Sequence, residues 1–449
     1  MLRAGSGPGL IEPGACRVRT KEINVSSVGL RATVVRSAAA FSLILFCAGA
    51  PAQTPTVRTT ITVASFPDLD RAAQAALPRW NRLHPDIAVR IVSHQYPDHH
   101  TAMTTALATG SGLPDVMAVD LRFLGKFGAS KGFEDLLQPP YDAGPLRDKF
   151  VRYAYAQAVN ARGELIAIPT DIGPGTLLYR KDLIDKAGLT EADLTGTWEA
   201  FIEAGKTLKA KTGLYLVADS ADIRDIVLRT GLKDGEGIYF DRDGKVLVES
   251  ARFKRAFELG RAAQQAGIAA GAVAWTNEWV ADFKQGRVAT QMMGAWLAGH
   301  LKNWIAPGSA GQWRSTTLPG GIYGAYGGSF YAIPRKSANK AAAWEFIRFM
   351  TTDKQSQIES LRVLDTFPSL LEAQADPLFD EPMPYLGGQK ARQLWRDIAG
   401  RVPGIPVHKY DAMATDMIRA EYENVVKQGK SVDAALADAR DVIERRARR

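Results

Sequence analysis

The sequence predicts an α/β protein with two domains. Between residues 60 and 119, short apolar runs alternate with amphipathic stretches in the order strand, helix, strand, helix, strand. This order is typical of a mostly parallel sheet. The chain has 449 residues, of which 46% are hydrophobic. Because that length exceeds what one hydrophobic core usually serves, a second domain is expected.

An export signal is expected in residues 1–52. The apolar run Ala38–Phe46 follows two arginines and precedes the small residues Ala48–Ala52, which is the order of a secretory signal peptide. The run is too short to cross a bilayer as a helix. We expect cleavage at the end of the small residues and a translation start later than residue 1. An uncleaved N-terminal anchor is the alternative.

The cysteines and the net charge exclude several function classes. Cys16 and Cys47 both lie in the expected leader, so the exported chain has no thiol for a disulfide, a thiolate metal site or a catalytic cysteine. The formal net charge is +8, and part of this excess lies in the leader and in the arginines of 445–449. A basic tail is not the charged stripe that nucleic-acid binding needs, so no nucleic-acid partner is expected.

In the first domain, candidate ligand residues follow the expected strands. In open α/β sheets, ligands bind at the carboxyl ends of the strands. Phe66 follows the first strand, Tyr96 the second, and Asp120 and Arg122 the third. The strands are expected at 60–64, 88–93 and 116–119, and the helices at 69–83 and 98–109.

The chain is organised around residues 165–179. A short apolar strand at 165–168 is expected to lead into a turn at 170–175 and then into a second strand. Binding residues concentrate in loops that a rigid scaffold holds, so Asp171 and Gly173 become candidates. The alternative is an ordinary turn between two buried strands.

A cluster of tryptophans lies in the second half of the chain. Five of the nine fall between Trp275 and Trp313. An aromatic face offers an apolar plate for the C–H side of a sugar ring, whereas buried tryptophans serve the core. We expect Trp275 and Trp296 to face a ligand and Trp304 and Trp313 to be structural. Helices are expected nearby at 198–211, 251–266, 275–285 and 340–351, and strands at 288–293 and 329–334.

No metal site, cofactor or familiar catalytic motif is expected. His99 and His100 are adjacent, and neither a His-x-x-x-His pair nor a complete calcium loop occurs. A nucleophile elbow, a phosphate loop and a dinucleotide fingerprint are also missing. Asp120 and Asp171 could form a glycosidase pair if they lie roughly 5–10 Å apart. Two acidic residues more often line a site for a polar ligand.

An ordered series of motifs resembles the bacterial extracellular solute-binding proteins of family 1, the maltose-binding-like receptors of ABC sugar importers. No single motif is strong, but the series spans nearly the whole exported chain. Thr290-Gln291 departs from the family pattern, which has a single Met there. The series comprises Gly110–Val116, Pro169–Leu189, Thr197–Glu199, Phe283–Trp296 and Gly327–Phe346.

The resemblance implies a type II-like periplasmic-binding-protein fold with two α/β lobes joined by a hinge. Lobe 1 would comprise residues 53–165 and 328–365, and lobe 2 residues 166–327 and 366–449. The chain would cross between them near 162–169, 326–332 and 365–368.

By the same resemblance, the protein would be a periplasmic, monomeric receptor and not an enzyme. It would close on a carbohydrate and deliver it to the membrane permease of an ABC transporter. Polyamine or other small-solute capture on the same fold is the alternative, and an exported glycosidase is less favoured. Arg122 or Arg362 in the cleft would favour an anionic sugar. The implied ligand-binding residues are Phe66, Tyr96, Asp120, Arg122, Asp171, Gly173, Trp275, Trp296, Gly328, Ser329, Phe330 and Arg362.

Overall fold

A computed structural model describes residues 58–448 of the chain. The expected signal peptide of residues 1–52, with both cysteines, lies outside the described residues. The described chain combines helices with one mixed sheet, so the predicted α/β class is confirmed. Among its helices, none has the length and apolar character needed to cross a membrane.

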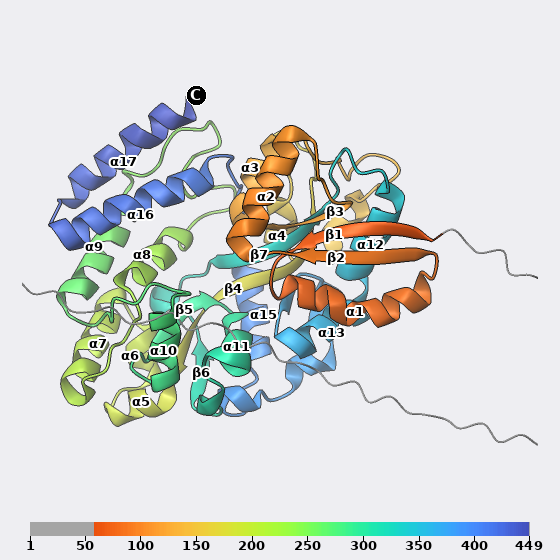
Figure 1. The fold of residues 1–449 in the computed structure, drawn as a ribbon. Coiled ribbons are helices and arrows are strands. Elements are labelled where there is room, and N and C mark those ends of the chain that lie inside the picture. The colour runs from red at the N-terminus through yellow and green to blue at the C-terminus, as the bar shows by residue number, and fades with distance from the viewer. Residues whose placement is uncertain (1–57, 449) are drawn as a thin grey trace, which may run out of the picture. The chain divides into compact units, whose positions relative to one another are not determined.

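The sheet runs in the order β2-β1-β3-β7-β4-β5 (Figure 1). β6 and β8 also pair with β4. β1 pairs in parallel with β2 and β3, and the remaining pairs are antiparallel. The expectation of a mostly parallel sheet therefore holds only for the first three strands. The strands are β1 Thr59–Ser65, β2 Ile87–Ser93, β3 Val116–Asp120, β4 Ile168–Arg180, β5 Thr290–Gly294, β6 Trp313–Thr316, β7 Ala325–Ala332 and β8 Phe367–Pro368.

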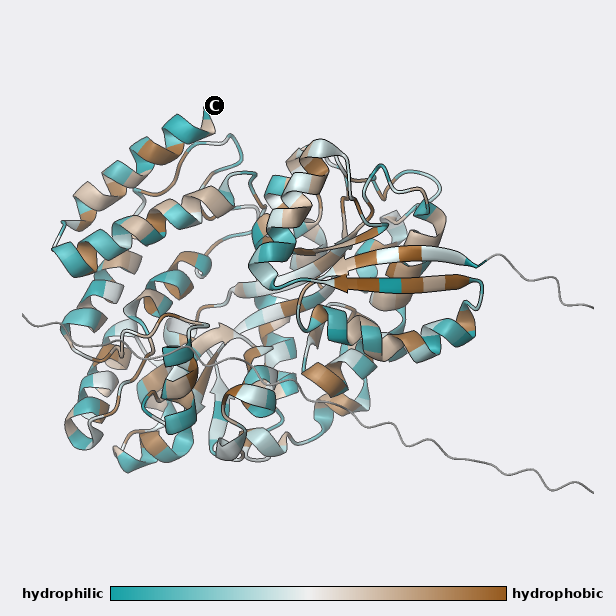
Figure 2. Cartoon of the chain, viewed as in Figure 1, coloured by the Kyte–Doolittle hydropathy of each residue, from teal (hydrophilic) through white to brown (hydrophobic). Residues whose placement is uncertain are grey.

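Hydrophilic and hydrophobic residues alternate along the helices (Figure 2), as amphipathic helices require. In α1, for example, the buried positions include Leu69, Ala73, Ala76 and Trp80, which follow helical spacing. The helices are α1 Leu69–Leu83, α2 Tyr96–Thr109, α3 Leu121–Ala129, α4 Arg152–Gln157, α5 Lys181–Lys186, α6 Glu191–Thr195, α7 Trp198–Thr212, α8 Ser220–Arg229, α9 Ala251–Gln265, α10 Asn277–Gln285, α11 Leu297–His300, α12 Lys340–Thr352, α13 Lys354–Leu364, α14 Leu371–Gln374, α15 Ala391–Arg401, α16 Asp411–Gln428 and α17 Val432–Ala447.

The turn expected at residues 170–175 does not form, because β4 is one continuous strand of 13 residues. Its first part pairs with β7 and β8, and its second part with β5 and β6. The glycines and prolines that suggested a turn lie where the register with β7 shifts, between Pro169 and Asp171 and between Ile172 and Pro174. Irregular register of this kind bends a strand without ending it.

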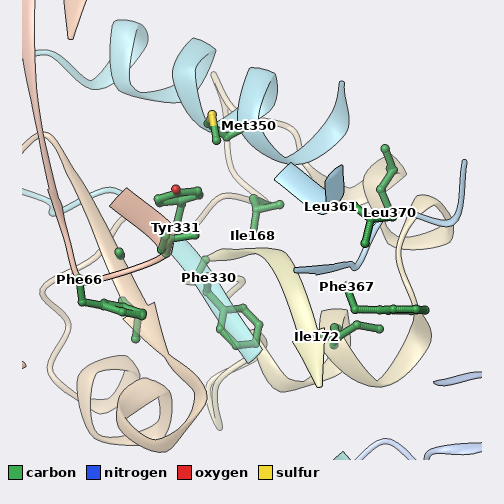
Figure 3. Close-up of a cluster of buried hydrophobic side chains, with 14 of the residues drawn as sticks. Phe66, Ile168, Ile172, Phe330, Tyr331, Met350, Leu361, Phe367 and Leu370 are labelled. Carbon is green, nitrogen blue, oxygen red and sulfur yellow. The ribbon is translucent and has the colours of Figure 1, made fainter. Parts of the chain in front are cut away.

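Buried apolar residues form two clusters. The larger includes the strands from β1 to β3, most of β7, and helices α1, α12 and α15. The smaller joins helices α7, α8 and α9 to the C-terminal helices α16 and α17. Phe330 and Tyr331 of β7 lie on opposite faces of the sheet within the larger cluster, with Tyr331 directed toward Met350 (Figure 3). This alternation along β7 fixes which of its residues can face a ligand.

The helix expected from residue 275 begins later, at Asn277. Thr276 caps it by accepting a hydrogen bond from the Trp279 amide at 3.3 Å. Trp275 stays outside the helix with a positive φ of 73°. The hydroxyl cap, which suits a helix N-terminus, outweighs the apolar spacing that placed Trp275 inside.

Candidate functional site

Two carboxylates flank one serine across three neighbouring strands. In the strand register, Ser329 of β7 is the partner of Asp120 of β3 on one side and of Asp171 of β4 on the other. Two strand spacings put the Cα atoms of these aspartates about 10 Å apart. Residues paired in register point to the same face of a sheet. The structure thus brings three predicted site residues into one row.

Asp120 is held by its own helix and by a tyrosine. Its Oδ1 accepts hydrogen bonds from the Arg122 amide at 2.8 Å, as the N-cap of α3, and from the Tyr96 hydroxyl at 3.0 Å. Burial raises the pKa of Asp120, and these hydrogen bonds oppose that rise. The Tyr96 ring meets Phe66 edge to face with centroids 5.6 Å apart. The contacts therefore bring four predicted residues together at the β3 end of the row: Phe66, Tyr96, Asp120 and Arg122.

A histidine that the sequence did not single out as a site residue supports this arrangement. His100 Nε2 accepts a hydrogen bond from the Asp120 amide at 3.2 Å, and its Nδ1 contacts the Tyr96 carbonyl at 2.8 Å. A neutral ring that accepts at Nε2 donates at Nδ1, so the two contacts fit one tautomer. Burial lowers the pKa of His100 to about 4. We assign His100 a positioning role for Tyr96 and Asp120.

Asp171 is a perturbed carboxyl at the other end of the row. Burial raises its pKa to about 7, and the negative charges of Asp120 and Asp68 add to the rise. Hydrogen bonds from Ser329 oppose it, including one from the Ser329 amide to Asp171 Oδ1 at 2.8 Å. A carboxyl poised near neutrality can either accept or donate a hydrogen bond.

Two predicted glycines leave room that a side chain would fill. A Cβ on Gly173 would lie 1.9 Å from the Tyr326 carbonyl oxygen and 2.7 Å from Trp296 Nε1. A Cβ on Gly328 would approach the Asp171 carbonyl at 3.3 Å, and its φ of 141° is one that other residues rarely adopt. The close approach of β4, β7 and Trp296 therefore requires glycine at both positions.

The four tryptophans named in the sequence predictions lie in different environments. Trp275 and Trp296 stack with centroids 5.9 Å apart and an interplanar angle of 20°. Trp275 is 49% exposed, and Trp313 is fully buried as expected. Trp304, which we expected to be structural, is 48% exposed. It packs against His300 with centroids 6.0 Å apart instead of entering the core.

The remaining predicted residues lie in other environments. Phe330 is buried in the core at 1% exposure. Arg122 forms a salt bridge with Asp416 of α16 at 2.6 Å. Arg362 is exposed on α13, near Asp376, whose pKa is lowered first by a hydrogen bond from the Leu378 amide and also by the Arg362 charge. The structure therefore groups Arg122 with the row through its helix cap, whereas Arg362 shares none of the hydrogen bonds and ring contacts described above.

Sequence reasoning missed a cation beside the row. Arg229, at the C-terminal end of α8, lies over the Tyr326 ring at 4.9 Å, and its positive charge opposes the rise that burial causes in the pKa of Asp120. Its Nε is buried without a hydrogen-bond partner in the described chain. No motif marks this arginine. Only the packing of α8 beside β7 reveals it.

A second missed contact joins Asp68, just after β1, to His300 of α11. His300 Nε2 lies 3.3 Å from Asp68 Oδ2, and the His300 ring meets the edges of both Trp275 and Trp296. Burial lowers the pKa of His300, against the opposing charge of Asp68. Aromatic planes, carboxylates and a guanidinium thus gather around β7, a combination suited to a polar ligand with apolar faces.

The described residues contain no group of three or more His, Asp or Glu side chains placed to hold a metal ion. His99, the neighbour of His100, places its Nε2 2.8 Å from the Ala118 carbonyl. Both imidazoles are thus engaged within the fold.

Comparison with known proteins identifies the family. Residues 64–357 match the family described as bacterial extracellular solute-binding protein. The chain belongs to this family. This solute-binding protein is 28% identical to the lactose-binding protein of Rhizobium radiobacter over 82% of its own length and 87% of that protein. It is 22% identical to an arabinooligosaccharide-binding protein of Halalkalibacterium halodurans, over 82% of its length and 85% of the relative.

A solved structure shares the fold. The ABC transporter associated binding protein of Bifidobacterium animalis subsp. lactis Bl-04, in complex with β-1,6-galactobiose, superposes with a TM-score of 0.72 at 21% identity. The match covers 86% of this solute-binding protein and 97% of that chain. The predicted two-lobed periplasmic-binding-protein fold is confirmed at the level of architecture.

Proposed function

We propose that this protein is the carbohydrate-capturing receptor of an ABC importer, with its site between the Asp120–Ser329–Asp171 row and the stacked pair Trp275 and Trp296. The stacked pair carries the proposal, because sugars present apolar C–H faces to aromatic rings and hydroxyls to carboxylates. Trp275 leaves about half of its surface open to a ligand. The relatives named for lactose and arabinooligosaccharide binding support the same ligand class.

In this proposal the protein binds its sugar without turning it over. Asp120 Oδ1 already accepts two hydrogen bonds, and Asp171 accepts one from the Ser329 amide. These hydrogen bonds fix the orientation of both carboxyls, which leaves Asp120 and Asp171 able to exchange hydrogen bonds with ligand hydroxyls. Chromatography of a sugar after long incubation with the protein should recover it intact. Cleavage that an Asp171→Asn variant abolishes would support a glycosidase instead.

Capture would proceed by closure of two lobes, which we assign to residues 53–165 with 328–365 and residues 166–327 with 366–449. β4 supports this proposal, because its two parts pair with different strands. Hinge closure around a ligand needs chain segments that connect both lobes. We further propose that the mature protein is a monomer, is exported to the periplasm and docks on a membrane permease.

Thermal unfolding of the Gln53–Arg449 protein tests the ligand class. The panel should contain neutral sugars from monosaccharides to trisaccharides, uronic acids, polyamines and ferric citrate. A ligand at about 100 times its Kd adds roughly 2.7 kcal/mol to the free energy of unfolding, which is a clear shift in Tm. We expect a neutral sugar to give that shift. A response confined to polyamines or iron would reject carbohydrate and keep the fold.

A further inference from the structure

Five side chains form a continuous aromatic wall that leads outward from β7. The wall comprises Tyr326, Trp296, Trp275, His300 and Trp304. Trp296 is 6.4 Å from Tyr326 and 5.9 Å from Trp275, between ring centroids, and His300 is 5.3 Å from Trp275 and 6.0 Å from Trp304. Tyr326 and Trp296 are half-buried, whereas Trp275 and Trp304 are exposed. The wall thus extends beyond the part that the proposed function uses.

The outer end of this wall is held by directed hydrogen bonds. An indole N–H can only donate, so the 3.0 Å contact from Trp304 Nε1 makes His300 Nδ1 an acceptor. The His300 proton then lies on Nε2, which faces Asp68 Oδ2 at 3.3 Å. Because its N–H is satisfied by His300, Trp304 offers a ligand the apolar face of its ring.

The backbone at both exposed tryptophans is unusual. Trp275 has a φ of 73°, a left-handed conformation that is costly for a bulky residue and clusters at functional sites. Trp304 lies in the short π-helix Leu301–Ile305, and π-turns inside helices are also frequent at functional sites. Tryptophan is well buried on average. Neither position is therefore explained by core packing.

Polar groups beside the outer end match a sugar better than an apolar partner. Asp68 carries a carboxylate next to His300, and Arg71 forms a 3.2 Å salt bridge with it. An acceptor and a donor thus lie across the His300 ring from Trp304. A sugar ring needs both, because its hydroxyls lie around an apolar face.

We infer that Trp304 is the platform of an outer sugar subsite, so that the ligand is an oligosaccharide whose terminal ring stacks on Trp304 with hydroxyls toward Asp68 and Arg71. This inference rests on the proposed carbohydrate function and extends it to chain length. The sugar next to it along the chain stacks on Trp275. Trp304 then determines how much more tightly the protein binds longer sugars than shorter ones.

Isothermal titration calorimetry on the Gln53–Arg449 protein tests the inference. The probes are three length series: glucose, maltose and maltotriose; galactose, lactose and 3'-galactosyllactose; and arabinose, α-1,5-arabinobiose and α-1,5-arabinotriose. The variants are Trp304→Ala, Trp304→Phe and the control Leu371→Ala, which truncates an apolar side chain of similar exposure, 44%, on α14. Because Trp304 is exposed, each variant should keep the wild-type Tm, which differential scanning calorimetry checks.

In the series that binds, we expect wild-type affinity to rise with chain length. Trp304→Ala should weaken binding of the longest sugar about tenfold, as loss of a ring contact implies, and change the shortest ligand less than about twofold. Trp304→Phe should keep most of the affinity, and Leu371→Ala all of it. Equal affinities of wild type and Trp304→Ala for every binding sugar would overturn the inference and leave carbohydrate capture intact. No binding by any sugar would overturn both.

Discussion

The indole N–H of Trp296 donates a 2.9 Å hydrogen bond to the backbone carbonyl of Tyr326. Trp296 immediately precedes α11, and Tyr326 belongs to β7, so the bond fixes the aromatic wall to the strand that carries Ser329. It spans 30 residues of sequence. The position of the stacked pair relative to the carboxylates depends on this contact.

A side chain at Gly173 should disturb that contact. In Gly173→Ala, the Cβ would meet the Tyr326 carbonyl at 1.9 Å and Trp296 Nε1 at 2.7 Å. Backbone cannot yield as a flexible side chain does, so β4 or β7 must shift. We expect the free energy of unfolding to fall by roughly 1–3 kcal/mol and sugar affinity to fall as well. Chemical denaturation and calorimetry measure the two effects. Gly308→Ala, with no atom within 4 Å of its Cβ, is the control, and equal losses in both variants would contradict the prediction.

Asp171 should give the stability a characteristic dependence on pH. Its folded pKa of about 7 exceeds the usual value of about 3.9 in an unfolded chain. The folded state therefore holds the proton more tightly, and the resulting stabilisation is complete below about pH 4 and lost as the pH rises through about 7. The Asp171→Asn variant lacks this titrating carboxyl, so its stability should not show this dependence on pH.

The measurement for Asp171 is Tm as a function of pH for both proteins. Relative to Asp171→Asn, the wild-type Tm should fall by a few degrees between pH 5 and pH 8. Asp86→Asn changes an exposed carboxylate and serves as the control. Parallel curves for wild type and Asp171→Asn would show that the Asp171 carboxyl is not perturbed.

Arg229 should contribute to affinity through the donors of its guanidinium. Its Nε has no partner in the described chain, and hydrogen bonds to charged groups contribute about 1.5–3 kcal/mol. We expect Arg229→Met to weaken sugar binding by roughly 10–100-fold and Arg229→Lys to recover little, because lysine lacks the planar fork. Arg445→Met, on the exposed last turn of α17, should leave the affinity unchanged. Unchanged binding by Arg229→Met would remove this residue from the site.

The Tyr96 hydroxyl should contribute both to the stability of the fold and to ligand affinity. Tyr96→Phe removes the hydroxyl that donates to Asp120 Oδ1 at 3.0 Å but keeps the ring that packs on Phe66. Asp120 Oδ1 then loses this hydrogen bond and must accept one from water or from a ligand instead. We expect a loss of about 1 kcal/mol in the free energy of unfolding together with a change in affinity, measured by denaturation and calorimetry. Wild-type values for both quantities would exclude a shared role for this pair.

Local sequence patterns were enough to predict the elements of residues 59–120. Alternating apolar runs placed β1, α1, β2, α2 and β3 within a few residues of their observed bounds, because each element satisfies its own periodicity. The ends of these strands then pointed to Phe66, Tyr96 and Asp120, which the structure brings together.

Features that depend on packing between distant segments could not be predicted from local sequence patterns. The glycines and prolines of β4 predict a turn locally, and only pairing with β7 keeps the strand extended. Arg229 and His300 carry no motif, since they meet β7 and Asp68 only after α8 and α11 are packed. The usual burial of tryptophan predicts a structural role for Trp304, whereas in the structure this residue lies in a π-helix and is exposed.

Calorimetric titration of one sugar against wild type, Trp275→Ala and Trp296→Phe tests the central claim most directly. The sugar is the one that raises Tm most in the thermal panel. We predict micromolar or tighter binding by wild type, a loss of about tenfold or more in Trp275→Ala, and a smaller loss in Trp296→Phe, which keeps a ring but not the bond to Tyr326. Wild-type affinity in both variants would show that the sugar binds elsewhere and would contradict the account.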